Sequence, residues 1–318
     1  MPADQILISI IMPVYNRAKS ARRAINSLAI FGNSSCELII VDDGSSDGSA
    51  EAAREATAGM DPALVRVLEQ KNAGPGAARN TGANVARGTY LAFIDSDDLW
   101  YPWTVEAIAS VIENHSPALA FLRTVDYEAG RTPPTLEHAK IETNLFPGFL
   151  EAVISEPSIR FGSGNLVVRR ALFSEIGGFT VEVRCAEDTD LFMRLADRGV
   201  CVLATAPVLV AIETDRGDNL TGGTDRVIDG VNYVISRDAS GAYLGDRRKR
   251  NVLISKLVVT AVKTAFAEGK AKAAYGFMIR RFHLIWRGRN WHWIIRLPIF
   301  PLLAALKPQS FIYKSRKG

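Results

Sequence analysis

The sequence predicts an α/β fold with an open, mostly parallel sheet, followed by a basic, mainly helical C-terminal extension. Apolar runs alternate with amphipathic segments over the front of the chain, acids and glycines directly follow the apolar runs, and the charge changes sign towards the end. Strand–helix alternation of this kind is typical of parallel sheets, which bind ligands at the carboxyl ends of their strands. We therefore expect a ligand site at the front of the chain.

The front of the chain divides into short strands and helices. Residues 6–14 form a nearly continuous apolar run, as in a strand that is buried on both faces. The next expected elements are helix 20–30, strand 37–41, helix 49–58, strand 64–68, a helix opened by Gly74-Pro75-Gly76, and strand 90–94. Proline at a helix start is favourable because its missing N–H would have no partner there.

The middle of the chain is less regular. We expect a strand at 118–125, a surface loop at 131–144, a strand at 166–169, a short helix at 171–176, a helix at 188–198, a strand at 200–203 and an amphipathic helix at 252–266. After Asp215 the alternation of strands and helices gives way to basic, mainly helical segments. This change predicts a domain of residues 1–215 and an extension of residues 216–318.

Composition excludes several classes of protein. Of the 318 residues, 47% are hydrophobic and 23% are charged, so the chain can bury a core and is not intrinsically disordered. The three cysteines, Cys36, Cys185 and Cys201, form no CxxC motif, which argues against a disulfide framework or a thiolate zinc site and fits a reducing cytosol. No signal-like segment opens the chain, the four histidines lack metal-ligand spacing, and no nucleophile signature is present.

Charge is distributed very unevenly. Residues 1–215 hold 18 basic and 28 acidic side chains, whereas residues 216–318 hold 20 basic and 6 acidic ones. This asymmetry predicts a front that uses carboxylates and a back that meets an anionic surface.

Four motifs follow predicted strands or open helices, and they should gather on one edge of the sheet. They are PVYN at 13–16, VDDGS at 41–45, NAGPGAARN at 72–80 and DSDD at 95–98. At a strand end, Asp42 and Asp43 can accept hydrogen bonds from a base or a ribose, although Asp-Gly-Ser is equally a turn sequence. The glycines and helix start at 74–80 suit phosphate oxygens, and Arg79 can add a charged contact.

Two acidic groups are candidates for chemistry. Asp95 and Asp97 follow a buried strand, and their oxygens suit Mg²⁺ or Mn²⁺, which accept diphosphate as a further ligand; a solvated acidic turn is the plain alternative. Glu187 and Asp188 open a helix, where acids are common as caps. Their functional interpretation is a general base that deprotonates an acceptor hydroxyl. Asp190 is a second acid in the same turn and leaves the identity of the base open.

The four motifs, in this order and spacing, resemble the donor half of family 2 glycosyltransferases of GT-A fold, and the similarity extends through Gly178-Phe179 to Glu187-Asp188. The resemblance implies a catalytic domain at 1–215, with a nucleotide-sugar half at 1–100 and an acceptor half at 101–215. It also implies an inverting enzyme that uses a nucleotide-diphosphate sugar, such as a UDP-sugar, and Mn²⁺ or Mg²⁺.

The resemblance also implies roles for single residues. Pro13, Tyr15 and Asp43 would hold the base, Arg79 would lie by the nucleotide, Asp95 would meet the ribose or a metal-bound water, and Asp97 would ligate the metal. Asp188 would be the base, with Glu187 beside it. The other donor-site candidates are Asn16, Asp42, Asn72, Gly76 and Ser96.

Two rival functions stay open. A nucleotidyltransferase would also use paired acids and a metal, but it should carry a basic, glycine-rich loop where this chain has Tyr15-Asn16-Arg17. A catalytically inactive nucleotide-sugar-binding module should lack one of the acids, and none is missing.

The basic tail is expected to hold a cytoplasmic enzyme on the inner face of the membrane without crossing it. From Arg247 onward there are 17 basic residues and one acid, with Trp286, Trp291 and Trp293 interleaved. The alternative is that these helices only pack on the rest of the protein. Membrane attachment would fit a glycan or lipid-linked acceptor in cell-surface polysaccharide synthesis, and no nucleic-acid partner is expected.

Overall fold

The computed structural model describes residues 6–28, 35–214 and 223–289. The chain forms two compact units. The first unit contains Met1–Gly148, Ile159–Val181 and Arg198–Gly217, and the second contains Phe149–Ser158, Glu182–Asp197 and Asp218–Gly318. The break at Gly217 lies beside the domain boundary expected at residue 215. Two segments from within the expected catalytic domain, however, group with the second unit.

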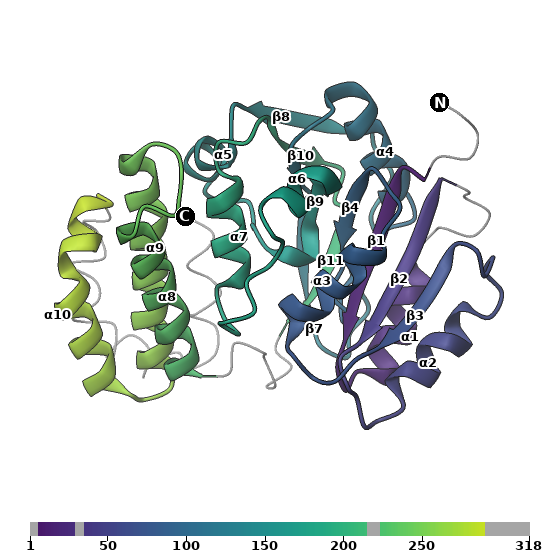
Figure 1. The fold of residues 1–318 in the computed structure, drawn as a ribbon, viewed down its shortest axis with the longest axis horizontal. Coiled ribbons are helices and arrows are strands. Elements are labelled where there is room, and N and C mark those ends of the chain that lie inside the picture. Colours follow the sequence, from purple (N-terminus) through teal and green to yellow (C-terminus); the bar gives the residue numbers. More distant parts are fainter. Residues whose placement is uncertain (1–5, 29–34, 215–222, 290–318) are drawn as a thin grey trace. The chain divides into compact units, whose positions relative to one another are not determined.

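The first unit is built on an eight-stranded sheet (Figure 1). Its strands, in spatial order, are β3 (Val65–Glu69), β2 (Cys36–Asp42), β1 (Ile8–Val14), β4 (Tyr90–Phe93), β9 (Leu166–Arg169), β6 (Leu119–Phe121), β10 (Cys201–Ala206) and β8 (Glu142–Phe146). The first four strands are parallel to one another, as are β6 and β10. β9 is antiparallel to both its neighbours, and β8 is antiparallel to β10. The predicted α/β fold with a mostly parallel sheet is thus confirmed.

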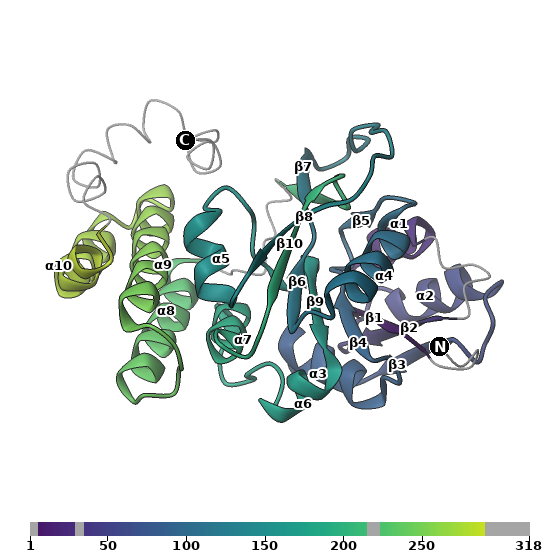
Figure 2. The ribbon, with the colours of Figure 1, turned by 90° about the horizontal axis from the view of Figure 1, so that it is seen from above.

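Helices cover both faces of this sheet, which explains why β1 and β2 are buried along their whole length. Figure 2 shows helices on either side of the sheet. On one face lie α1 (Ala18–Ser27), α2 (Ser49–Thr57) and α4 (Thr104–His115), and on the other lie α3 (Pro75–Val85) and α6 (Arg170–Glu175).

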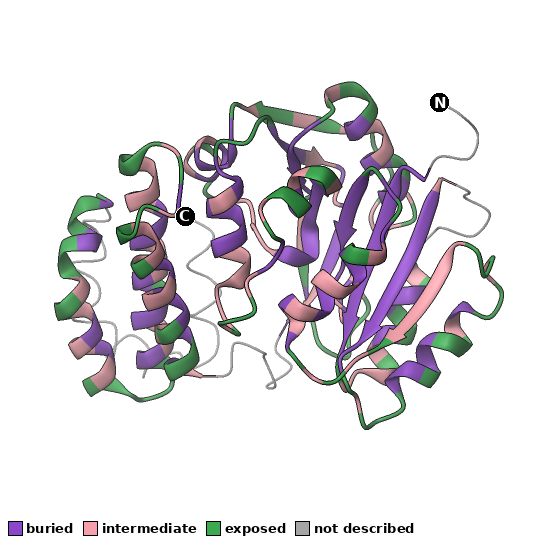
Figure 3. Ribbon diagram, in the orientation of Figure 1, coloured by how far each residue is buried: buried purple, intermediate pink, exposed green. Residues whose placement is uncertain are grey.

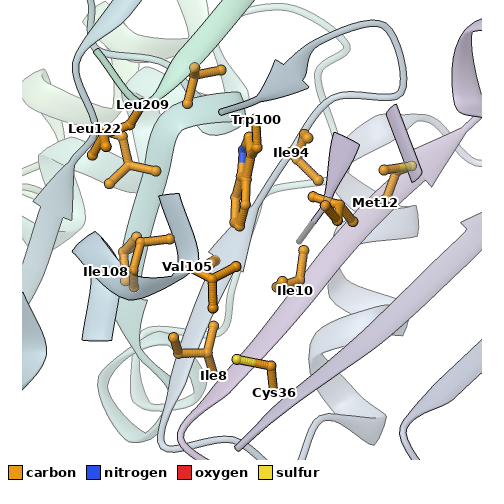
Figure 4. Close-up of a cluster of buried hydrophobic side chains, with 14 of the residues drawn as sticks. Ile8, Ile10, Met12, Cys36, Ile94, Trp100, Val105, Ile108, Leu122 and Leu209 are labelled. Atoms are coloured by element: carbon orange, nitrogen blue, oxygen red, sulfur yellow. The ribbon is translucent and has the colours of Figure 1, made fainter. Parts of the chain in front are cut away.

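The core on the α1 and α4 face is continuous across the sheet. Alternate β1 residues, Ile8, Ile10 and Met12, pack with Val105 and Ile108 of α4 (Figure 4). Because strand side chains alternate between faces, the intervening Ile11 faces α3, where a Cβ on Gly82 would meet its Cγ2 at 2.7 Å. Both faces of β1 are therefore buried, and only the strand end is free to carry a site.

A second, three-stranded sheet completes the first unit. Its strands are, in order, β5 (Leu99–Trp100), β11 (Val210–Thr214) and β7 (Thr124–Glu128). The strand expected at 118–125 is therefore two strands in different sheets. The chain leaves the large sheet after Phe121, and the Arg123 carbonyl then accepts hydrogen bonds from Leu209 and Val210 at the start of β11. The expected loop at 131–144 also ends earlier, because β8 begins at Glu142.

The second unit is helical. It contains α5 (Phe149–Ser155), α7 (Glu187–Leu195), α8 (Thr224–Ala239), α9 (Arg247–Ala267) and α10 (Ala271–Arg287). The helix expected at 252–266 is the longer α9, which begins where the Asp246 carboxylate accepts hydrogen bonds from the backbone N–H groups of Arg248 and Lys249. Its apolar residues, including Ile254, Val258 and Val262, are buried within the unit (Figure 3).

None of the helices in the described ranges is both long and apolar enough to span a bilayer. Trp291 and Trp293, which the sequence singled out in the tail, lie outside the described residues.

Candidate active site

Three of the motifs follow three adjacent parallel strands. Register places the last residue of β1, Val14, beside the last residue of β2, Asp42, and Ile11 beside the last residue of β4, Phe93. The chain order reverses around β1, since β2 and β3 lie on one side and β4 on the other. Ligands in open α/β sheets bind at such a switch point, outside the carboxyl ends of the strands.

The loops after β1 and β2 are joined by hydrogen bonds. The Asn16 backbone N–H donates to the Ser45 hydroxyl at 2.9 Å, and the Asn16 side-chain oxygen accepts from the Ser46 N–H at 2.9 Å. Asn16 has a φ of 50°, which asparagine tolerates better than most residues. Asn16 thus shapes the loop that carries Tyr15, whose side chain is exposed beside it.

Asp43 is a buried acceptor for the segment that precedes α3. One carboxylate oxygen accepts from the Gln70 side-chain amide at 2.7 Å and the Ala73 N–H at 2.9 Å, and the other accepts from the Gly74 N–H at 2.8 Å. Gly44 allows this close approach, because a Cβ there would lie 2.9 Å from the Asn72 nitrogen. Both oxygens of the Asp43 carboxylate therefore already accept hydrogen bonds from the protein. A contact between Asp43 and a nucleotide base stays a prediction.

Asp42 has one oxygen in a turn and one without a protein partner. Its Oδ2 accepts from the Ser45 N–H at 2.9 Å, in keeping with the turn interpretation of Asp-Gly-Ser. Its Oδ1 is buried and has no hydrogen-bond partner among the described residues. A buried acceptor of this kind is costly unless a donor reaches it, and a base N–H is such a donor.

Arg79, from α3, pairs with Asp95, which follows the end of β4. Its guanidinium donates to the Asp95 carboxylate at 2.6 Å and lies 5.3 Å from the centre of the Phe179 ring. The Arg79 side chain is 5% exposed and that of Asp95 is 38% exposed, so solvent reaches the pair from the carboxylate side. Beside them, the Asn80 amide pairs with both the backbone N–H and the carbonyl of Phe179, at 2.8 Å each. The sequence motifs at 72–80 and 177–179 therefore meet.

The acidic run after β4 could hold a divalent metal. A Cβ on Gly164 would lie 2.7 Å from an Asp95 oxygen and 3.1 Å from an Asp98 oxygen, so these two carboxylates converge beside a glycine. Asp97 is half-buried in the same run, as is Asp95, while Ser96 is buried. Over residues 6–28, 35–214 and 223–289, no three His, Cys, Asp or Glu side chains form a metal-binding group. Mg²⁺ needs only one or two carboxylates when diphosphate completes its shell, so the residues fit.

The candidate base residues, Glu187 and Asp188, lie at the start of α7, which belongs to the second unit. Glu187 and Asp188 are half-buried, and Asp188 accepts a 2.6 Å hydrogen bond from the Thr189 N–H. Burial, and then the negative charges of Glu187 and Asp188, raise the pKa of the nearby Cys185 thiol to about 11. This thiol is therefore protonated at neutral pH.

Asp190 differs from its neighbours because it is fully buried. One oxygen pairs with the Arg194 guanidinium at 2.7 Å, and the other accepts from the Tyr243 hydroxyl at 2.8 Å. Burial, followed by the charge of Asp190, raises the pKa of Tyr243, so the hydroxyl keeps the proton it donates. Asp190 thus ties α7 to the segment that precedes α9.

Several residues that contact the predicted site residues could not be recognised in the sequence. Gln70, Gly164 and Tyr243 each contact a predicted residue, but they come from a strand end, a short turn and a loop that carry no motif. Gly178-Phe179, to which the family resemblance extends, does contact a motif residue, because Phe179 pairs with Asn80. Among the other candidates, Pro13 lies near the end of β1, Asn72 lies beside Gly44, and Gly76 is buried in α3.

Comparisons with known proteins agree with this geometry. Residues 9–177, more than half of the chain, match the model of the family described as "Glycosyl transferase family 2". An uncharacterised glycosyltransferase of Rickettsia conorii is 33% identical over 204 residues, which cover 62% of this chain and 32% of that protein. The uncharacterised glycosyltransferase EpsJ of Bacillus subtilis is 33% identical over 189 residues, 58% of this chain and 54% of that protein. The chain thus spans about a third to a half of the length of these relatives.

Solved structures share the fold. S. aureus TarS (residues 1–349), solved with UDP-GlcNAc, has a TM-score of 0.60 at 19% identity, covering 79% of this chain and 71% of that one. The mannosyltransferase PcManGT of Pyrobaculum calidifontis, solved with GDP-Man and Mn²⁺, has a TM-score of 0.53 at 16% identity, covering 97% and 89%. At these identities the likeness concerns the fold, which is of the GT-A type expected from the sequence. Given the match over residues 9–177, the chain belongs to glycosyl transferase family 2.

Proposed function

We propose that this family 2 glycosyltransferase moves a sugar, with inversion, from a nucleotide-diphosphate sugar to a hydroxyl of a glycan or lipid-linked acceptor. The proposal rests on the buried, unsatisfied Oδ1 of Asp42 at the end of β2, together with the Arg79–Asp95 ion pair after β4, at the switch point of the sheet. The first offers an acceptor for a base, and the second places a cation and an anion where a sugar nucleotide would extend.

The donor would bind along the strand ends. Exposed Tyr15 would stack on the base, Asp42 would accept its N–H, and Asp95 would accept from the ribose. Asp43 would act through the backbone, since it holds Ala73 and Gly74 in front of α3. A UDP-sugar is the proposed donor, in keeping with the UDP-GlcNAc bound by the related fold of TarS.

Asp97, with Asp95, would hold Mn²⁺ or Mg²⁺ against the diphosphate. A metal bound there would neutralise the charge that develops on the leaving diphosphate. Asp95 and Asp97 suit this role because they are partly exposed and directly follow β4 at the sheet edge. The mannosyltransferase PcManGT was solved with Mn²⁺, which supports the choice of metal.

Asp188 would take the proton from the acceptor hydroxyl, which then attacks the anomeric carbon from the face opposite the diphosphate. One displacement inverts the anomeric centre and needs no enzyme nucleophile. Asp188 is favoured over Asp190, because Asp190 is fully buried and both its oxygens are occupied by Arg194 and Tyr243. A general base must be within reach of the proton that it abstracts.

The proposed setting is cell-surface polysaccharide synthesis, by a cytoplasmic protein attached to the inner face of the membrane. The strongly basic charge from residue 216 onward supports attachment to anionic lipid.

The rival function, a nucleotidyltransferase, would give a different product. It would release diphosphate from a nucleoside triphosphate, whereas the proposed enzyme releases a nucleoside diphosphate from a sugar nucleotide.

Calorimetry and product analysis test the proposal. UDP should bind in the presence of Mn²⁺ and weaken when the metal is chelated, and the anomeric coupling constant of the product should show an inverted centre. Retention of configuration, or binding of nucleoside triphosphates without any binding of UDP, would rule the proposed reaction out.

A further inference from the structure

Helix α10 carries three large apolar side chains on its exposed surface. Ile279 is 70% exposed, Phe282 is 42% exposed and Trp286 is 52% exposed, and the Phe282 and Trp286 rings lie 6.4 Å apart. Spacings of three and four residues place them in one stripe along the helix. Figure 3 shows exposed residues along this helix, and Phe277, Leu284 and Ile285 form its buried side.

A basic stripe runs directly beside the apolar one. Each exposed apolar residue is followed by an exposed basic residue or histidine, namely Arg280, His283 and Arg287, and these are again three and four residues apart. Lys272 extends the stripe by two turns. No Asp or Glu occurs in Ala271–Arg287, so the surface presents positive charge without internal compensation.

We propose that this surface of α10, defined by Ile279, Phe282 and Trp286 with Arg280 and Arg287, seats the protein on an anionic lipid membrane. The inference rests on the proposed membrane attachment and assigns it to a surface. A helix with an apolar stripe, a basic flank and aromatic rings suits the boundary between headgroups and acyl chains. The helix would lie in the plane of that boundary, since it is too short and too polar to cross.

Helix α9 does not share this role, although it is also basic. Its apolar side chains, among them Val259 and Phe266, are buried within the second unit. Truncation before Arg247 would therefore remove part of the core along with any membrane surface. Substitutions on α10 are the sharper test, because they change only exposed side chains.

The test uses the full-length protein and sedimentation with vesicles of phosphatidylcholine, alone or with phosphatidylglycerol. The apolar variant is Ile279→Ser/Phe282→Ser/Trp286→Ser, and the charge variant is Arg280→Gln/Arg287→Gln. Each should weaken binding to phosphatidylglycerol vesicles by roughly tenfold or more. The matched controls, Leu145→Ser/Val181→Ser and Lys19→Gln/Lys140→Gln, change exposed residues of the first unit and should bind as the parent does.

A second readout reports insertion directly. Brominated acyl chains should quench part of the tryptophan fluorescence, and Trp286→Phe should remove that part. Absence of binding to anionic vesicles, or undiminished binding by both α10 variants, would overturn the proposal. The proposal would also be overturned if only the charge variant lost binding and nucleic acid displaced the protein from the vesicles. A change of oligomeric state in the apolar variant would assign the surface to a second copy of the chain.

The vesicle result is separable from the proposed transfer. Nucleoside diphosphate release from a water-soluble donor should be the same in the parent and both α10 variants. If no donor were consumed by any of them, the transferase proposal would fail while the sedimentation result still decided the role of α10.

Discussion

The Asp43 carboxylate accepts a 2.8 Å hydrogen bond from the Gly74 N–H, and this bond couples the end of β2 to the start of α3. It brings together two motifs that lie 30 residues apart in the sequence. The same carboxylate accepts from Ala73 and Gln70, so the segment in front of α3 depends on a single buried acid.

Asp43→Asn should weaken both the fold and the donor site. The amide keeps one acceptor oxygen but turns an NH₂ group towards N–H donors, which costs about 1–3 kcal/mol of unfolding free energy. UDP affinity should fall by roughly tenfold as the segment shifts. Urea unfolding and calorimetry measure the two effects. Asp61→Asn is the control, because exposed Asp61 accepts from only one backbone N–H and the amide can replace it. Equal behaviour of the two variants would refute this role of Asp43.

Asp97→Ala should abolish transfer and leave the melting temperature unchanged. Asp97 is half-buried at a strand end, so removing its carboxylate costs little packing but would remove a ligand of the proposed metal. Donor consumption and Mn²⁺ binding by electron paramagnetic resonance provide the measurements, with the exposed Glu137→Ala as control. Near-normal turnover with any accepted donor would show that Asp97 does not hold the metal.

Asp188→Asn and Asp190→Asn should separate catalysis from structure. Asp188→Asn keeps an oxygen for the Thr189 N–H, so it should bind donor normally while transfer falls by ~10²–10⁴-fold. Asp190→Asn removes the buried carboxylate that pairs with the partly buried Arg194 and should cost about 3 kcal/mol of stability.

Single-turnover transfer and thermal unfolding report on these two variants. An effect of Asp188→Asn confined to donor affinity would take that residue out of the base role. A fully stable Asp190→Asn variant with slow transfer would move the role to Asp190.

The buried carboxylate of Glu37, near the start of β2, should make the stability of the fold depend on pH. Burial raises its pKa, but hydrogen bonds from Ser9 and Arg87 and the charge of Arg87 outweigh this and lower it below the ordinary 4.5. A lowered folded-state pKa stabilises the fold above the unfolded-state pKa, and this contribution is lost as the pH falls through the folded value.

Glu37→Gln should therefore cost about 2 kcal/mol at pH 7, and its difference from the parent should shrink below pH 4.5. Urea unfolding across pH measures this. Glu69→Gln, which breaks an exposed ion pair with Arg54, should cost much less, because solvent screens that pair. A Glu37→Gln deficit that persists undiminished in acid would contradict the assignment.

The sequence predicted the elements whose pattern is local and missed those set by long-range contacts. The apolar run of β1 and the Gly-Pro-Gly start of α3 were sufficient, because a doubly buried strand and a proline helix start are each visible in a few residues. The division of residues 118–125 between two sheets was not predictable. It depends on the Arg123 carbonyl meeting β11, more than 80 residues later.

The candidate site divides in the same way. The sequence placed Asp42, Asp43, Arg79 and Asp95 at one sheet edge, because parallel strands bring their carboxyl ends together. It could not show that Asp43 is engaged with the protein, or that Asp190 is sealed by Tyr243, since those partners carry no motif. Burial separates Asp188 from Asp190, and spacing within one helical turn cannot.

The most direct test of the proposed sugar transfer is nucleoside diphosphate release from a panel of nucleotide sugars, measured with Mn²⁺ and after chelation. We expect release from at least one donor, preferentially a UDP-sugar, which stops when the metal is removed and is absent in Asp97→Ala. Absence of release from every donor in the presence of glycan and lipid-linked acceptors, or release that persists fully after chelation, would contradict it.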